Sequence, residues 1–237
     1  TSPGSSINDG NLSCRGTYHI LMSDGYWSEG SSYDADTAGA RLNVDGTDGP
    51  TITGPGGESY TYRAVGPFED AHDDTLADVA MYYWKRDLQP GLDNEVPTNP
   101  HDPAFWQHVV TFTVGLGVEG DKSPSYAFSV IDQSVDIDWI DPQASGLSTA
   151  DSNAAKIDDM LHAAINSRGG FFSAKNPTEF ANALTDTLGN IADRTSSAAS
   201  VVLNSNTLFE GSRLFQAIFR TDKWSGDIRS YQIAEDG

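Results

Sequence analysis

Cysteine, positive charge and long apolar runs are all scarce in this sequence. Cys14 is the single cysteine, so no disulfide can form within the chain. It is either a reduced thiol or one half of a disulfide whose partner lies outside these 237 residues. No stretch approaches the roughly 20 consecutive apolar residues that a membrane-spanning helix requires, so the sequence predicts no membrane insertion.

Negative charge dominates the sequence. The chain has 14 Lys and Arg against 34 Asp and Glu, which gives a formal net charge of −20 at pH 7. Such a chain repels the phosphates of nucleic acids and the anionic surface of a membrane, so neither is predicted as a partner. The acidic composition is compatible with the binding of cations that prefer oxygen ligands, such as calcium.

The first 195 residues predict strands that alternate with helices. Short apolar runs are typical of strands buried in a parallel sheet, and apolar residues at a spacing of three and four indicate helices. The strands are expected near 18–22, 109–114 and 170–173, and the helices over 75–88, 156–166 and 177–191. This order predicts an α/β fold, a doubly wound, mostly parallel sheet with flanking helices.

Each predicted helix has a stripe expected to face the core. The first stripe is Leu76, Val79, Ala80, Tyr83 and Trp84, with Asp73 or Asp74 as the N-cap. The second is Ile157, Met160, Leu161, Ala164 and Ile165, with Gly169 and Gly170 ending the helix. The third is Phe180, Leu184, Leu188 and Ile191, and the run Asn176-Pro177-Thr178-Glu179 predicts a strong helix start.

Two further segments differ in composition from this pattern. Residues 28–70 are rich in Gly, Ser, Thr, Asp and Pro, and predict a surface insertion that is either functional or mobile, with a short strand in "ESYTYRAV". From residue 196 the alternation of apolar and polar residues predicts antiparallel β structure. The chain is therefore expected to contain an α/β domain over 1–195 and a β segment over 196–237.

Three glycines after the second strand fit the dinucleotide-binding pattern G-x-G-x-x-G. They are Gly115, Gly117 and Gly120 in "GLGVEG". That pattern needs a helix N-terminus to receive the pyrophosphate, and the following "DKSPSYAFS" shows no helical period. We therefore expect no cofactor here, and we interpret the glycines as a sharp turn at the rim of the sheet.

Candidate metal ligands occur in two places. Asp24 follows the first strand in "YHILMSDGYW", where its side chain could either bond the backbone of a turn or face a ligand at the rim of the sheet. A second group consists of Asp132, Asp136, Asp138 and Asp141. These carboxylates could ligate calcium or be solvated loop acids, since the segment lacks the Gly and terminal Glu of an EF-hand loop.

Signals for catalysis are absent from the sequence. The five histidines are scattered, and there is no G-x-S-x-G elbow, phosphate-binding loop or H-E-x-x-H. The chain is therefore expected not to be an enzyme. The alternative from another functional class is a divalent-metal-dependent hydrolase that uses Asp24 and the acidic group at 132–141.

Several long segments together resemble one family. They are "YHILMSDGYW", "TLADVAMYYWKRDL", "NEVPTNPHDPAFWQHVVTFTVGLGVEG", "AKIDDMLHAAINSRGGFFSAKNPTEFANAL" and "KWSGDIRSYQI". Over most of residues 14–237 the chain resembles the PilC/PilY family of type IV pilus tip-associated adhesins and biogenesis factors. The resemblance implies a von Willebrand factor A-like domain, followed in that family by a β-propeller that this chain does not contain.

The same resemblance implies a function and a location. It implies a non-enzymatic protein that acts in pilus assembly and surface adhesion. The expected location is the pilus tip at the cell surface, reached by export through the periplasm. The implied partners are minor pilins or other pilus-assembly proteins and a host or abiotic surface. No Arg-Gly-Asp tripeptide is present.

The resemblance also implies a role for Asp24. Von Willebrand A domains hold a divalent ion through a D-x-S-x-S loop, a Thr in a later loop and an Asp after a further strand. Asp24 matches that last Asp, and Thr75 does not match the family's order. We therefore expect the C-terminal part of an A-like domain, with Asp24 as one ligand of an incomplete Mg or Ca site. We also expect an open sheet edge, covered by a cognate protein or a second copy.

Overall fold

The computed structural model describes residues 10–24, 26, 38–174, 176–196, 201–203, 213–220 and 225–232. The chain divides into two compact units, residues 1–189 and 190–237, and each is described by itself. Helix α5 (Pro177–Ser196) crosses this boundary.

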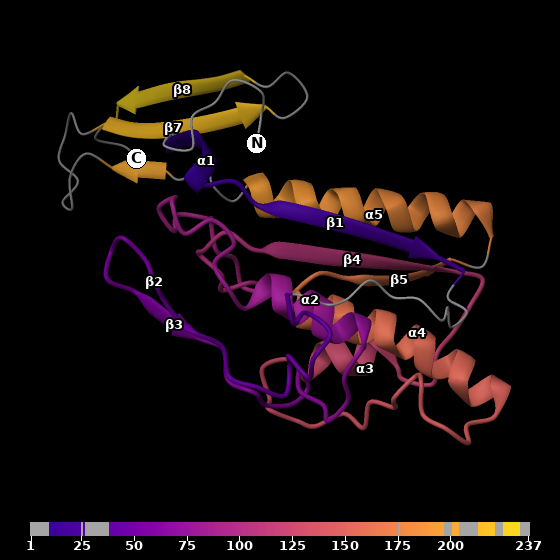
Figure 1. Ribbon diagram of the computed structural model, residues 1–237. Coiled ribbons are helices and arrows are strands. Elements are labelled where there is room, and N and C mark those ends of the chain that lie inside the picture. Colours follow the sequence, from indigo (N-terminus) through magenta and orange to yellow (C-terminus); the bar gives the residue numbers. More distant parts are fainter. Residues whose placement is uncertain are drawn as a thin grey trace. The chain divides into compact units, whose positions relative to one another are not determined.

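A three-stranded parallel sheet forms the centre of the first unit (Figure 1). Its strands are β1 (Thr17–Ser23), β4 (Val109–Leu116) and β5 (Phe171–Ala174), in the order β1-β4-β5. Both pairs are parallel, which confirms the predicted strands and their arrangement. β4 is buried along most of its length because it has a neighbour on each side, whereas β1 and β5 are the outer strands of the described sheet.

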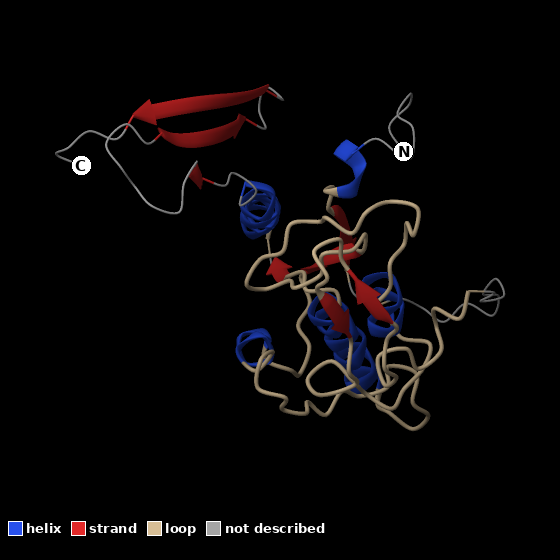
Figure 2. Cartoon of the chain, turned by 90° about the vertical axis from the view of Figure 1, so that its left-hand side faces the viewer, coloured by secondary structure: helices blue, strands red, loops and turns tan. Residues whose placement is uncertain are grey.

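Helices cover both faces of the sheet (Figures 1 and 2). α2 (Leu76–Trp84) and α4 (Thr149–Asn166) lie on one face, where the Thr113 hydroxyl of β4 donates to the Met160 carbonyl at 2.9 Å. α5 lies on the other face. This arrangement confirms the α/β prediction with a mostly parallel sheet and flanking helices.

The predicted stripe of α4 is correct, and that of α2 is partly wrong. All five predicted α4 residues are at most 1% exposed. In α2, Tyr83 is 41% exposed, and Met81 faces the core instead. In α5, Leu188 is 53% exposed, which is a further error in the predicted stripes.

The N-cap of α2 also differs from the prediction. It is Thr75, not Asp73 or Asp74, because Thr75 and Asp78 form a reciprocal capping box.

The C-terminus of α4 is built differently from the prediction. The helix ends at Asn166, and Arg168 rather than a glycine has the left-handed backbone, at φ 61°. The Arg168 guanidinium lies over the ring of Trp84 at 4.0 Å. Gly169 is needed for a close approach, since a Cβ there would lie 1.8 Å from the Thr111 carbonyl oxygen.

Residues 38–70 contribute buried side chains to the core, which corrects the prediction that this segment is a surface insertion. They contain a hairpin of β2 (Thr51–Thr53) and β3 (Ser59–Thr61), which confirms the strand expected in "ESYTYRAV". Four of their side chains join the main hydrophobic cluster with Trp84 and Trp106, namely Val44, Ile52, Tyr62 and Phe68. Residues 28–37 of the predicted insertion lie outside the described residues.

The remaining elements are two short helices and a second sheet. α1 (Gly10–Ser13) precedes β1, and α3 (Pro124–Ser129) follows β4, where no helix was predicted. β6 (Val201–Leu203), β7 (Arg213–Arg220) and β8 (Ser225–Gln232) form an antiparallel sheet, as predicted. Within the described ranges, no helix combines the length and apolar character needed to cross a bilayer.

Candidate functional site

The two predicted metal-ligand groups occupy separate, largely exposed positions. Asp24 directly follows β1 at the carboxyl rim of the sheet and is exposed. The acidic group at 132–141 lies on the connection between α3 and α4, where the Asp141 carboxylate accepts from the Gln143 backbone N–H. The described part of the chain does not gather these four carboxylates into a cluster of ligand atoms. Metal binding by either group stays a prediction.

The described residues bring a different set of ionisable side chains together. Asp45, Asp70 and His162 have ligand atoms that all lie within 4.8 Å of one another. Asp45 and Asp70 come from the segment predicted to be a surface insertion, and His162 comes from α4. Sequence reasoning missed this group. The available signal was a row of polar residues at helical spacing, Asp158, Asp159, His162 and Asn166, beside the apolar stripe of α4.

Both ring nitrogens of His162 face oxygen atoms. Nε2 lies 2.8 Å from the Phe68 carbonyl oxygen, and Nδ1 lies 3.5 Å from Oδ2 of Asp70. Oδ2 of Asp45 is 3.7 Å from Nε2, and the ring stacks on Trp139 with centroids 4.2 Å apart. A carbonyl and a carboxylate only accept, so the protonated ring satisfies both. A metal would require a ring nitrogen without its proton.

The pKa values of the three groups follow from this geometry. Burial disfavours the charged form of His162, but Asp70 and Asp45 outweigh burial and raise the pKa of the His162 ring. Burial opposes ionisation of Asp70 too, yet the His162 ring lowers the pKa of Asp70 below its usual value. Burial raises the pKa of Asp45 to about 7. The result is a buried ion pair of His162 and Asp70 beside the Asp45 carboxyl, whose ionisation is disfavoured by burial.

The neighbouring buried acids bind backbone N–H groups. Asp159 accepts from the N–H groups of Leu76 and Ala77 at 2.9 and 3.0 Å, at the start of α2. Burial raises the pKa of Asp159 to about 6. Asp78 accepts from the Val44 N–H at 2.7 Å. These carboxylates connect α2, α4 and the segment 38–70. Asp159 also has a structural role, because its negative charge lies at the N-terminus of α2 and accepts hydrogen bonds from N–H groups there.

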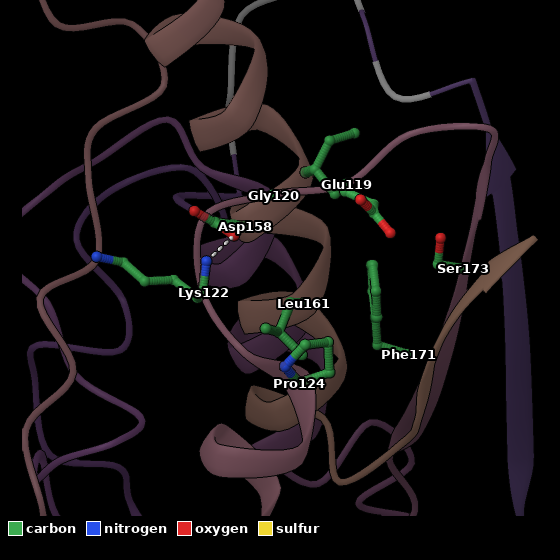
Figure 3. Close-up of a pocket in the computed structure, with 9 residues that line it drawn as sticks. Glu119, Gly120, Lys122, Pro124, Asp158, Leu161, Phe171 and Ser173 are labelled. Atoms are coloured by element: carbon green, nitrogen blue, oxygen red, sulfur yellow. Dashed lines mark hydrogen bonds between the residues drawn. The ribbon is translucent and has the colours of Figure 1, made fainter. Parts of the chain in front are cut away.

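A cavity of about 180 Å³ lies beside β5, between α3, α4 and the loop after β4 (Figure 3). Its polar lining includes Glu119, Lys122, Asp158 and Ser173. The Asp158 carboxylate accepts from the Lys122 N–H at 3.0 Å, and the Ser173 hydroxyl donates to the Val118 carbonyl at 3.1 Å. None of the nine lining residues is a histidine, so the serine has no imidazole base in the cavity.

The loop that leads into this cavity contains the three glycines of "GLGVEG". Gly117 has a φ of 74°, as expected for a sharp turn at the rim. A Cβ at Gly120 would lie 2.0 Å from Oδ1 of Asp158, so this glycine allows the loop to approach α4 closely. These positions have a conformational reason for glycine that is independent of any cofactor.

Comparison with known proteins shows a relationship over nearly the whole chain. The type IV pilus biogenesis factor PilY1 of Pseudomonas aeruginosa strain PAO1 is 33% identical over 245 residues, which cover 93% of this chain and 20% of PilY1. PilY1 of strain PAK is 33% identical over 251 residues, with the same coverage. This chain is a relative of the PilY1/PilC family. The family predicted from the sequence is confirmed.

The extent of the match limits what the relatives say about this chain. The chain spans about a fifth of the length of the PilY1 proteins that it matches. PilY1 is named as a biogenesis factor of type IV pili, and not as an enzyme. No profile of a known protein family matches the chain, and no solved structure is similar to it.

Proposed function

We propose that this chain is a non-enzymatic binding region of a type IV pilus biogenesis factor. The observation that carries the proposal is the match to PilY1 along 93% of the chain. In this proposal the protein acts at the pilus tip, in pilus assembly and in attachment to surfaces. Its partners there are minor pilins or other assembly proteins, and it reaches the cell surface through the periplasm.

A von Willebrand A-like fold is part of the proposal. The parallel order β1-β4-β5, with α2 and α4 on one face and α5 on the other, supports this fold. Asp24 lies after β1 at the rim where A domains hold their divalent ion. In a longer chain Asp24 would supply one oxygen ligand of a Mg or Ca site.

A binding role agrees with how the polar groups of the first unit are used. His162 and Asp70 pair with each other, and Asp78 and Asp159 bind backbone N–H groups. The hydroxyl of Ser173 donates to a carbonyl. These groups hold the fold together, and their hydrogen bonds do not form a nucleophile–base pair of the kind that covalent catalysis by a serine requires.

The experiment is a chromosomal deletion of residues 10–196 in the organism that makes the protein, complemented by the wild-type gene. We expect loss of surface pili, measured as pilin in the sheared fraction, and loss of attachment to a solid surface. Complementation with Tyr83→Ala serves as a control, since Tyr83 is exposed. Normal pili and normal attachment in the deletion strain would contradict the proposal.

A second measurement tests the proposal that the chain is not an enzyme. We expect the purified chain to show no hydrolysis of a generic phosphoester in the presence of Mg²⁺. Hydrolysis that is lost in Asp24→Asn would instead show a metal-dependent hydrolase.

A further inference from the structure

The hydrogen bonds of β5 leave alternate backbone groups directed away from the sheet. The Thr113 N–H of β4 donates to the Gly170 carbonyl at 2.9 Å, and the Gly117 N–H donates to the Ala174 carbonyl at 2.7 Å. In a parallel ladder the even-numbered residues of β5 therefore bond to β4. The N–H and C=O groups of Phe171 and Ser173 point to the opposite side, where β5 has no neighbouring strand in the described sheet.

Two cavities flank this outer edge. The cavity of about 180 Å³ lies on the α4 side, where Phe171 meets Ile157 and Leu161. A second cavity of about 410 Å³ lies toward α5, and its lining includes Phe172 of β5 and Ala183 and Asp186 of α5.

Three residues line both cavities: Pro124, Phe171 and Ser173. The two spaces therefore meet along β5. We call this continuous space the β5 slot, with α3 and α4 forming one wall and α5 the other. Figure 3 shows Phe171 and Ser173 on β5 facing the loop that contains Glu119. A slot with an open strand edge at its base has the shape that an extended segment fills.

The charges of the slot determine which kind of segment fits. Glu119, Glu179 and Asp186 line it, and Lys122 is the one Lys or Arg among its described lining residues. The whole chain has a formal net charge of −20, so a second copy would be repelled. A segment with basic side chains is favoured. Successive side chains of a strand point to opposite faces, so apolar side chains at alternate positions would lie on one face and contact either Phe171 or Phe172.

We propose that the outer edge of β5 binds an extended segment of a partner protein that carries lysine or arginine, by addition of a strand. The inference rests on the proposed binding function and names the surface and the chemistry of the partner. Main-chain hydrogen bonds to Phe171 and Ser173 hold the segment. The acidic walls select its charge.

The test uses two blocked hexapeptides of equal length, one alternating Lys and Val and one alternating Glu and Val. Their binding to the purified chain is measured by calorimetry at low and at high salt. We expect the Lys-Val peptide to bind at least ten-fold more tightly than the Glu-Val peptide, and to weaken as salt rises. Absence of Lys-Val binding, or equal binding of both peptides, would overturn the proposal.

A backbone variant tests strand addition itself. Ser173→Pro removes the outward N–H and leaves the bonds from Phe172 and Ala174 to β4 in place. Ser173→Ala is the matched control, because it deletes only the hydroxyl group. We expect at least a ten-fold loss of Lys-Val affinity in Ser173→Pro and little change in Ser173→Ala, with circular dichroism confirming the fold. Unchanged affinity in folded Ser173→Pro would refute strand addition.

A charge variant tests the β5 slot if Ser173→Pro does not fold. Asp186→Lys reverses a charge on the α5 wall, and Glu58→Lys makes the same change at an exposed position outside the slot. We expect weaker Lys-Val binding in Asp186→Lys alone. Equal affinities in the two variants would count against the slot. Failure of peptide binding with a positive result in the pilus assay would refute the slot while leaving the proposed function standing.

Discussion

Replacement of Asp45 by Asn tests the electrostatics of the buried network directly. Asp45 is 0% exposed, and its Oδ2 accepts from Nδ2 of Asn166 at 2.8 Å. Asn has nearly the same shape as Asp and does not ionise. Oδ1 of Asn166 has no hydrogen-bond partner, so it can accept from the new amide after its side chain rotates. The substitution therefore removes one titration and preserves the packing.

The size of the effect follows from the pKa of Asp45. Burial raises this pKa from 3.8 to about 7. Each unit corresponds to about 1.4 kcal/mol, so full ionisation costs at most about 4 kcal/mol. Because the folded state binds this proton more tightly, the stabilisation is complete below the unfolded pKa and is lost as the pH rises through 7. Between pH 5 and pH 8 the loss amounts to roughly 2 to 3 kcal/mol.

Urea unfolding followed by tryptophan fluorescence measures this loss. We expect the free energy of unfolding of Asp45→Asn, relative to wild type, to rise by about 2 to 3 kcal/mol from pH 5 to pH 8. The titration of His162 is present in both proteins, so the comparison mainly reports Asp45. Asp132→Asn, at an exposed position, is the control and should show a nearly constant difference. A constant difference for Asp45→Asn as well would refute the proposed state of Asp45.

Three further outcomes are expected from the structure. Met81→Ala should lower the free energy of unfolding by about 2 to 5 kcal/mol, because Met81 is fully buried, whereas Tyr83→Ala should cost less than about 1 kcal/mol; similar costs would contradict the observed face of α2. Thr75→Ala should cost about 1 kcal/mol in urea unfolding by removing the capping box with Asp78, and an unchanged midpoint would show that the cap does not stabilise α2. Calorimetric titration of the wild type with Mg²⁺, Mn²⁺ and Ca²⁺ should show no micromolar binding at Asp24, because Asp24 is exposed and joins no group of ligand atoms among the described residues, and a single carboxylate holds a hard ion weakly; micromolar binding abolished by Asp24→Ala would prove this wrong.

Local patterns determined the elements of the first unit. β4 is predictable because a run of β-branched and aromatic residues fits a strand that is buried on both faces. The start of α5 is predictable too. Asn176 accepts from the N–H groups of Thr178 and Glu179, as the order Asn-Pro-Thr-Glu indicates. The apolar stripe of α4 was correct in all five positions because a long helix repeats its signal over several turns.

Tertiary packing decided which face of α2 is buried. Apolar residues occur around much of this helix, so its periodicity allows either Tyr83 or Met81 to face inward. Contact with α4 and the segment 38–70 selected Met81. Composition also misjudged that segment, because Gly, Pro and Asp promote turns whether a loop is exposed or packed against a core.

The buried network and the β5 slot were likewise beyond the sequence alone. Asp45, Asp70 and His162 are far apart in the chain, and only the docking of residues 38–70 on α4 places their charges within 4.8 Å. The open edge of β5 depends on the order of strands, which no local pattern encodes. Turn chemistry and helical spacing act over a few residues, whereas burial, pairing of charges and strand order arise from contacts between distant segments.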